Sequence, residues 1–139
     1  MIRPFNFYSS RADPRSPYSG VITKFIERVR KGEPPVIEGD GQQTRDFIHA
    51  ADVALMAAQL VDAPGMSGLV FNCGSGKPTS VIDLARMTIA ASEKQLKPEF
   101  AAARRGDIRH SLADVTKARM LLGFTPEISL EEGLRDMLS

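Results

Sequence analysis

The chain has 139 residues, of which 42% are hydrophobic and 25% are charged, and its 18 basic and 17 acidic residues leave a formal net charge of +1. This size and composition are typical of one globular domain. The balanced charge excludes a surface field strong enough to attract nucleic acid or an anionic membrane by itself. A single cysteine, Cys73, excludes an internal disulfide and is typical of a reducing compartment. Because no apolar run approaches the roughly 20 residues that span a bilayer and the N-terminus lacks the apolar core of a signal peptide, we expect a cytoplasmic protein.

Strand-like and helix-like segments alternate along the chain and predict an α/β fold, a single small domain over residues 1–139 with a short mixed sheet and about five helices. Short apolar runs predict strands near residues 2–8, 36–38, 45–49, 69–73 and 98–101. Apolar positions at helical spacing predict helices near residues 20–31, 52–62, 80–92, 114–122 and 129–138. Residues 9–19 contain two prolines and several small polar residues and are expected to form a loop.

Residues with capping chemistry stand at the ends of these predicted helices. Lys31-Gly32 and Gly123 are expected to end the first and fourth helices, because glycine readily takes the positive φ that follows a helix. The expected N-caps are Asp52, Asp114 and either Thr79 or Ser80. Ser129 and Glu132 have the spacing of a capping box before the last helix.

The rest of the chain is organised around the segment 39–49. Gly39 and Gly41 flank Asp40 in a turn that requires positive φ or close backbone approach, and Arg45 follows at once on a strand-like segment. An isolated arginine is most often a solvated surface side chain. The function of Arg45 therefore depends on its neighbours.

A second charged cluster lies near the C-terminal end, where five charged or imidazole side chains fall within seven residues: Arg104, Arg105, Asp107, Arg109 and His110. Such a run is usually a solvated face. Together with Arg45 it has another interpretation, because guanidinium groups match phosphate oxygens in bidentate geometry. Two arginines from separate loops could clamp a diphosphate.

A further glycine turn, 74–76, follows the predicted strand 69–73 and suggests phosphate binding. The spacing G-x-G-x-x-G is not completed, because residue 79 is threonine. We therefore favour a plain connection from strand to helix over a phosphate loop.

Four segments, in the right order, resemble one family. Residues 39–54 (GDGQQTRDFIHAADVA), 3–8 (RPFNFY), 70–76 (VFNCGSG) and 104–111 (RRGDIRHS) are similar to the motifs of NAD-dependent sugar epimerases and dehydratases, the extended short-chain dehydrogenases typified by UDP-glucose 4-epimerase. Ala113-Asp114, Lys117-Ala118 and the ending LLGF and SLEEGL fit as well. The resemblance covers nearly the whole chain but only the family's C-terminal, substrate-binding part, without the N-terminal Rossmann half.

The resemblance implies a binding site for a nucleotide-diphosphate sugar, such as a UDP- or dTDP-sugar. Its substrate-binding residues would be Asn6, Arg45, Arg104 and Asp107. Arg45 and Arg104 match positions that contact the diphosphate, and Asp107 matches a carboxylate that holds the ribose or orients an arginine. Glu38 departs from the pattern, because many relatives have an aromatic residue there, and Ser9-Ser10 replace a usual Gly-Pro.

The family's catalytic motifs are absent from this chain. Relatives bind NAD through an N-terminal glycine fingerprint and use a Tyr-x-x-x-Lys pair, but Tyr8 is followed four positions later by Ala12, and Tyr18 by Ile22. We therefore assign no catalytic, cofactor-binding or metal-binding residues and expect the chain alone to be inactive and to bind no NAD. His49 is expected to pack or hydrogen-bond rather than catalyse, and Cys73 to be a small buried hydrophobe.

Two functions from different classes stay open. The chain could be the nucleotide-sugar-binding part of an epimerase or dehydratase, as a fragment or as half of a split enzyme. It could instead be a non-enzymatic, self-associating structural or interaction protein derived from a truncated gene. Because the first strand begins at Met1, we expect its sheet neighbours to lie upstream in residues that this chain lacks, and its uncovered edge to lead to a homo-oligomer or to a missing Rossmann half. The C-terminus is expected to be complete.

Overall fold

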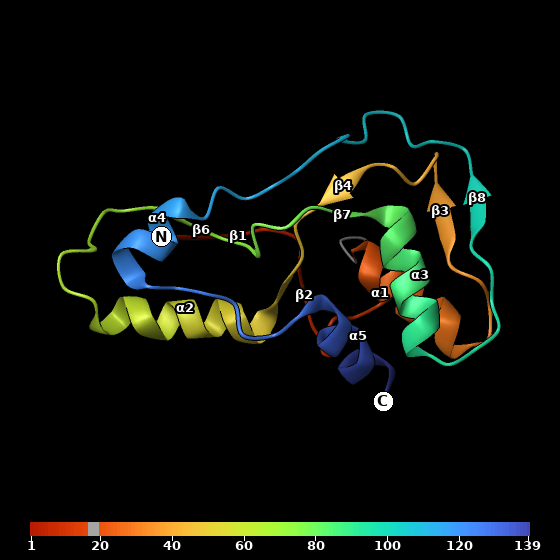
Figure 1. Ribbon diagram of the computed structural model, residues 1–139, viewed down its shortest axis with the longest axis horizontal. Helices are drawn as coiled ribbons and strands as arrows, with labels where there is room; N and C mark the ends of the chain where they lie inside the picture. Colours follow the sequence, from red (N-terminus) through yellow and green to blue (C-terminus); the bar gives the residue numbers. More distant parts are fainter. Residues whose placement is uncertain (17–19) are drawn as a thin grey trace.

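The computed structural model describes residues 1–16 and 20–139 and is elongated, with a different group of helices at each end (Figure 1). All five predicted helices are present, which confirms the α/β fold. They are α1 (Val21–Arg30), α2 (Ala50–Asp62), α3 (Val81–Ala91), α4 (Thr116–Leu122) and α5 (Leu130–Leu138). The expected loop 9–19 falls partly on residues 17–19, outside the described part. Of the described helices, none has both the length and the apolar character needed to cross a bilayer.

Eight short strands join the helices: β1 (Ile2–Pro4), β2 (Phe7–Tyr8), β3 (Val36–Glu38), β4 (Thr44–Arg45), β5 (Ile48–His49), β6 (Phe71–Cys73), β7 (Thr79–Ser80) and β8 (Glu99–Ala101). The pairs β1–β6, β2–β5 and β3–β8 are parallel, and β4–β7 is antiparallel. The mixture of directions is as predicted, although the strands form four two-stranded sheets.

Two predicted strands are each broken in the middle. Asn6 has a φ of 27°, which no extended strand accommodates, and it separates β1 from β2. Asp46 and Phe47 separate β4 from β5, and the Asp46 side chain is completely buried. Both breaks lie next to the cavity described below.

Most predicted helix ends are confirmed. Ser80 caps α3 by accepting the backbone N–H of Asp83 at 3.1 Å, and Ser129 and Glu132 form the complete capping box of α5. Gly123 ends α4 with a φ of 63°. These three ends follow from capping chemistry within four residues. The expected cap Asp114 differs, because the N-cap of α4 is Val115, although Asp114 Oδ1 accepts the Thr116 N–H at 3.0 Å.

The prediction that Asp52 is a helix N-cap was wrong. The helix begins two residues earlier, at Ala50, and its N-cap is His49, whose Nδ1 accepts the backbone N–H of Ala51 at 3.3 Å. Asp52 is instead buried in the first turn and accepts the backbone N–H groups of Glu127 and Ile128 at 2.8 and 3.3 Å. A buried carboxylate needs such donors, and Asp52 thereby fixes the segment that leads into α5.

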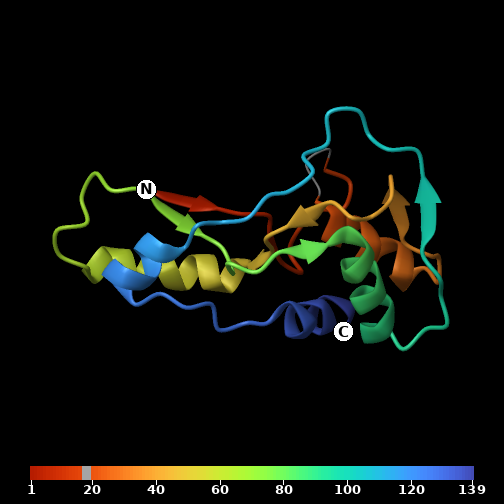
Figure 2. The same ribbon diagram turned by 45° about the horizontal axis from the view of Figure 1, so that its top comes forward.

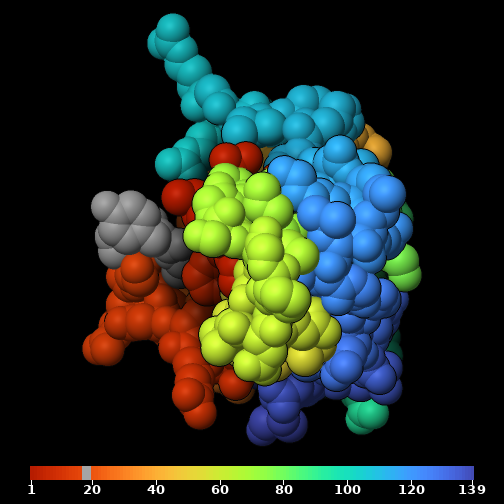
Figure 3. All heavy atoms as spheres, turned by 90° about the vertical axis from the view of Figure 1, so that its left-hand side faces the viewer, coloured from red at the N-terminus to blue at the C-terminus, as the bar shows by residue number. Residues whose placement is uncertain are grey.

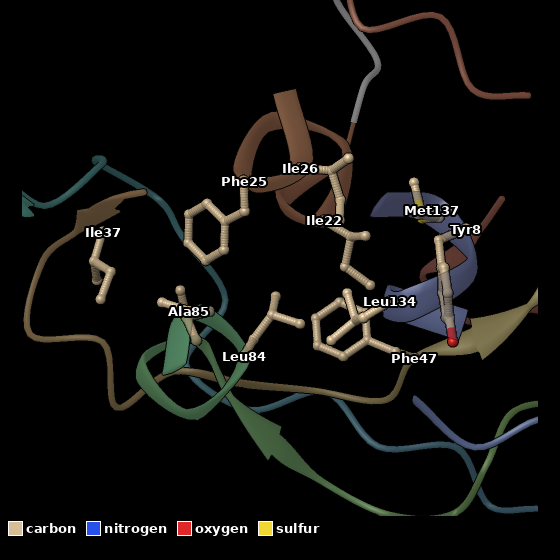
Figure 4. Packing of buried hydrophobic residues seen from close by; sticks show 11 residues of the cluster. Tyr8, Ile22, Phe25, Ile26, Ile37, Phe47, Leu84, Ala85, Leu134 and Met137 are labelled. Carbon is tan, nitrogen blue, oxygen red and sulfur yellow. The ribbon is translucent and has the colours of Figure 1, made fainter. Parts of the chain in front are cut away.

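Each end of the molecule has its own hydrophobic cluster. At one end α1, α3 and α5 pack around Phe25, Leu84 and Leu134, with Phe47 and Tyr8 closing the cluster (Figure 4). At the other end α2 and α4 accompany the β1–β6 pair, an arrangement that is also clear in Figure 2. The side chains of this second cluster are Ile48, Met56, Phe71, Cys73, Ala118 and Phe124.

Candidate functional site

The first glycine turn has the geometry that its sequence predicts. Gly39 and Gly41 have φ values of 79° and 74°. A Cβ at Gly41 would lie 2.9 Å from the Cβ of Ile82, so only glycine lets the turn approach the start of α3 so closely. The Ile82 N–H donates to the Gly41 carbonyl at 3.0 Å. The turn is thus fixed against α3 and directs the following strand, β4, along the edge of a cavity.

Arg45, the last residue of β4, is held in place by two hydrogen bonds. Its Nη1 donates to the Thr44 carbonyl at 2.8 Å, and its Nη2 donates to Asp107 Oδ1 at 2.6 Å. Only 14% of the Arg45 side chain is exposed, against 38% for Asp107. Because the pair is partly shielded from water and charge-assisted, it fixes the guanidinium more firmly than a fully exposed ion pair would.

Residues 102–109, which we call the strap, carry Arg104 and Asp107 and are fastened at both ends. At one end β8 pairs with β3, and the Gly39 N–H donates to the Ala101 carbonyl at 3.0 Å. At the other end the Thr44 N–H donates to the Arg109 carbonyl at 2.9 Å. All strap residues are exposed, and in the end-on view of Figure 3 this part of the chain (cyan) forms the top of the molecule.

A bidentate ion pair also ties the strap to the first glycine turn. Arg109 donates from Nη1 and Nη2 to the two carboxylate oxygens of Asp40 at 2.8 and 2.9 Å. The Arg109 hydrogen bonds, with that of the Gln42 backbone N–H, lower the pKa of Asp40 to about 2. His110, at the end of the strap, contacts Thr44 Oγ1 through Nδ1 at 3.0 Å.

The four residues predicted to bind substrate line one cavity of about 400 Å³. Asn6 comes from the β1–β2 break and donates from Nδ2 to the Asp46 carbonyl at 3.0 Å. Arg45 comes from β4, and Arg104 and Asp107 from the strap. The fold therefore gathers residues as far apart in the sequence as Asn6 and Asp107, although their roles in binding stay a prediction.

Several residues of the cavity carry no sequence motif. The residues that sequence reasoning missed come from α1, β3 and the start of α3: Lys24, Phe25, Arg28, Val36 and Val81. Glu38 and Gln43, which the sequence analysis included, line the cavity as well. The helical spacing of Gly20, Lys24 and Arg28 places them on one face of α1. Nothing local indicates that this face borders a cavity rather than open solvent.

The second glycine turn, 74–76, encloses a carboxylate of the protein itself. Asp46 Oδ1 accepts the N–H and the hydroxyl of Ser75 at 2.7 and 2.6 Å, while Oδ2 accepts the N–H groups of Gly76 and Ala113 at 2.9 and 3.2 Å. A Cβ at Gly74 would lie 2.5 Å from the Ala113 Cβ. The donors of this turn are occupied, which agrees with our rejection of a phosphate loop.

His49 packs and hydrogen-bonds, and Cys73 is a small buried side chain, as predicted. The rings of His49 and Tyr8 meet edge to face with centroids 5.3 Å apart. Cys73 is completely buried, and burial raises the pKa of its thiol to about 11, with smaller contributions from Asp52 and Asp46. A thiol with a raised pKa is a poor nucleophile at neutral pH.

Comparisons with known proteins agree with the sequence motifs. Residues 1–137 match the family of GDP-mannose 4,6 dehydratase. UDP-glucose 4-epimerase of Mycolicibacterium smegmatis is 38% identical over 133 residues, which are 96% of this chain and 42% of that protein. The chain thus spans less than half the length of the curated relatives that it matches.

Solved structures share the fold over nearly the whole chain. A crystal structure of UDP-glucose 4-epimerase from Thermotoga maritima with UDP-glucose has a TM-score of 0.91 at 35% identity and covers 99% of this chain, but only 43% of its own chain is matched. UDP-glucuronic acid 4-epimerase from Bacillus cereus, in complex with UDP-glucuronic acid and NAD, has a TM-score of 0.86 at 28% identity over 99% of this chain and 43% of its own.

Proposed function

The chain belongs to the GDP-mannose 4,6 dehydratase family, where it corresponds to a C-terminal part of an extended short-chain dehydrogenase, and we propose that its cavity binds the nucleotide diphosphate of a UDP- or dTDP-sugar. The observation that carries this proposal is the convergence of Asn6, Arg45, Arg104 and Asp107 on one cavity. In this role the chain is the nucleotide-sugar-binding portion of an NAD-dependent sugar epimerase or dehydratase. The relatives whose structures hold UDP-sugars support that class of ligand.

The chemistry of the cavity suits a diphosphate. Arginine forms charge-assisted bidentate hydrogen bonds with phosphate oxygens, and Arg45 is already oriented by Asp107. Arg104 has no side-chain partner within the part of the chain that the structure describes, so its guanidinium is available to an anion. The amide of Asn6 supplies a neutral donor at the same cavity. Asp107 is partly exposed, so its second oxygen can accept a hydroxyl of the ribose.

In this proposal NAD is bound by the longer relatives and not by the residues of this chain. The turn 74–76 has its donors occupied by Asp46, and the sequence holds neither the glycine fingerprint nor a Tyr-x-x-x-Lys pair. We expect the chain alone to show no saturable NAD⁺ binding in a calorimetric titration and no turnover of UDP-glucose or dTDP-glucose. Micromolar NAD⁺ binding would overturn this part of the proposal.

The test of nucleotide-diphosphate binding compares two neighbouring arginines. Arg104→Ala removes a cavity cation, whereas Arg105→Ala makes the same change in charge on the same strap at a residue that does not line the cavity. Calorimetric titration with UDP should show weaker binding by about 1.5–3 kcal/mol for Arg104→Ala, because one charge-assisted contact is lost, and little change for Arg105→Ala. Equal UDP affinity in the two variants would reject the cavity as the binding site.

Exposed apolar side chains keep the self-associating alternative open. Met1, Phe7 and Met120 are 79%, 62% and 78% exposed, and apolar side chains exposed in this way favour association where they form a patch. The Phe71 and Cys73 side chains are buried, so residues 1–8 are the better place for a contact between copies. Sedimentation equilibrium at micromolar concentration should then give a mass above 15.2 kDa, and a clean monomer would exclude this role.

A further inference from the structure

We propose that Lys24 is a further ligand-binding residue, which contacts the diphosphate from the part of the cavity wall that α1 forms. No motif marked this lysine, and the inference rests on the proposed function. It concerns which cations of the cavity remain available once the internal contacts of the protein are satisfied.

The cavity has an excess of positive charge. Its lining contains four cationic side chains, Lys24, Arg28, Arg45 and Arg104, and only two carboxylates, Glu38 and Asp107. Like charges around a low-dielectric hollow repel one another and attract an anion. A cavity with an excess of two positive charges therefore suits a diphosphate.

Two of the four cations already have partners in the protein. Arg28 donates from Nε to the Pro34 carbonyl at 2.6 Å and lies 3.3 Å from a Glu33 carboxylate oxygen. Arg45 is held by Asp107 and by the Thr44 carbonyl. Among the described residues, neither the Lys24 ammonium nor the Arg104 guanidinium has a hydrogen bond or an ion pair with the protein.

Lys24 is also the exception on its own helix. The other cations of α1 and its C-cap each have a partner: Arg28 as above, Arg30 with the Met137 carbonyl at 2.6 Å, and Lys31 with Glu27 at 2.9 Å. The helix presents Ile22, Ile26 and Val29 to the core, and Phe25, which is also buried, reaches the wall of the cavity. Lys24 thus projects from the face of α1 that borders the cavity, and it has no internal role that accounts for it.

The two unpaired cations come from different elements. Arg104 lies on the strap and Lys24 on α1, and both line the same cavity. A diphosphate in this cavity would receive hydrogen bonds from both elements, with Arg45 as the oriented third donor. Lysine suits this position, because its flexible stem and three donors adapt to a phosphate without fixed bidentate geometry.

The experiment uses a matched pair of substitutions on one helix. Lys24→Met removes the cavity cation, and Lys31→Met makes the same change at an exposed lysine that does not line this cavity. Both variants lose one positive charge, so the net charge of the protein changes equally. Lys24→Arg restores the cation. Since Lys24 is exposed, its replacement should leave the thermal midpoint close to that of the wild type.

Dissociation constants for UDP, inorganic pyrophosphate and uridine are measured by calorimetry. We expect Lys24→Met to weaken UDP and pyrophosphate binding at least about tenfold, the loss typical of a charge-assisted hydrogen bond, and to leave uridine binding unchanged. Lys31→Met and Lys24→Arg should stay within about threefold of the wild type for UDP.

The outcomes separate this inference from the proposed function. If wild-type protein binds UDP, Arg104→Ala weakens that binding and Lys24→Met does not, the inference is overturned and the proposed function stands. If Lys24→Met weakens uridine as much as UDP, Lys24 acts on the nucleoside and the diphosphate contact is overturned. If the wild type does not bind UDP at all, both are overturned.

Discussion

The two glycine turns of this chain look alike in sequence and differ in what they enclose. Turn 39–41 places its carboxylate, Asp40, outward in an ion pair with Arg109 of the strap. Turn 74–76 closes around the buried carboxylate of Asp46, which takes four hydrogen bonds from it and from Ala113. Backbone N–H groups in a tight turn bind an anion, whether it is a ligand or a carboxylate of the protein itself. A glycine pattern alone therefore does not tell a ligand site from a structural one.

The difference assigns separate tasks to the two turns. The first orients β4 and the strap, and with them Arg45, Arg104 and Asp107 at the cavity. The second turn, through Asp46, links the segment between β4 and β5 to the segments that carry Gly76 and Ala113. It thereby stabilises this part of the fold. We expect substitutions at the second turn to lower the stability of the whole protein, and changes at the first to act mainly on the strap.

The largest expected effect comes from Asp46→Ala. This change leaves the buried N–H of Ala113 and the partly buried donors of Ser75 and Gly76 without an acceptor, and each unsatisfied buried group costs about 1–3 kcal/mol. Urea denaturation should show a loss on the order of 3–5 kcal/mol. The control Asp40→Ala removes an exposed carboxylate and should leave the urea midpoint close to the wild type. Similar urea midpoints in the two variants would contradict the separate roles of the two turns.

A smaller loss is expected from Gly74→Ala. The new Cβ would lie 2.5 Å from the Ala113 Cβ and 2.7 Å from Asp46 Oδ2, so neighbouring groups must move at a cost of about 1–3 kcal/mol. Gly20→Ala is the comparison, since a Cβ there meets nothing within 4 Å and its φ is −71°. The measurement is the difference in thermal midpoint. If Gly74→Ala were as stable as Gly20→Ala, turn 74–76 would have room for a Cβ, contrary to these distances.

The smallest effect concerns pH and the first turn. The Arg109 hydrogen bonds hold the pKa of Asp40 at about 2, below the ordinary value of 3.8. A carboxyl with a lowered pKa in the folded state stabilises it above the unfolded pKa, and this contribution is lost as the pH falls from about 4 towards 2. Carbon-detected NMR of Asp40 should give a titration midpoint near 2 in the wild type. In Arg109→Ala it should move up towards 3.8, and an unchanged midpoint would show that the pair does not persist in solution.

Local patterns predicted much of this molecule. Helix periodicity placed all five helices, and short-range capping placed Ser80 and the Ser129–Glu132 box. The resemblance to known epimerases selected Arg45 and Arg104, which the fold brings to one cavity. The helix and cap predictions are confirmed because their physical causes lie within a few residues, whereas ligand binding by Arg45 and Arg104 stays a prediction.

The predictions that failed or were not made depend on pairs far apart in the chain. Asp52 has the chemistry of an N-cap, but its partners are the backbone N–H groups 75 and 76 residues further on. Asp46 was read only as part of a motif, although its donors lie 29, 30 and 67 residues away. Lys24 looks like any lysine on an amphipathic helix. The role of each of these residues becomes evident only when the tertiary structure shows its neighbours.

The most direct test of the account is a titration of the ¹⁵N-labelled chain with UDP, followed by amide chemical shifts. We predict that the largest changes map to the cavity, at Lys24, Arg45 and the strap residues Arg104 to Asp107, while Ser75 and Gly76 keep their shifts because their N–H groups are bonded to Asp46. Large shifts at Ser75 and Gly76, with the strap unaffected, would contradict it and make the second glycine turn the anion site.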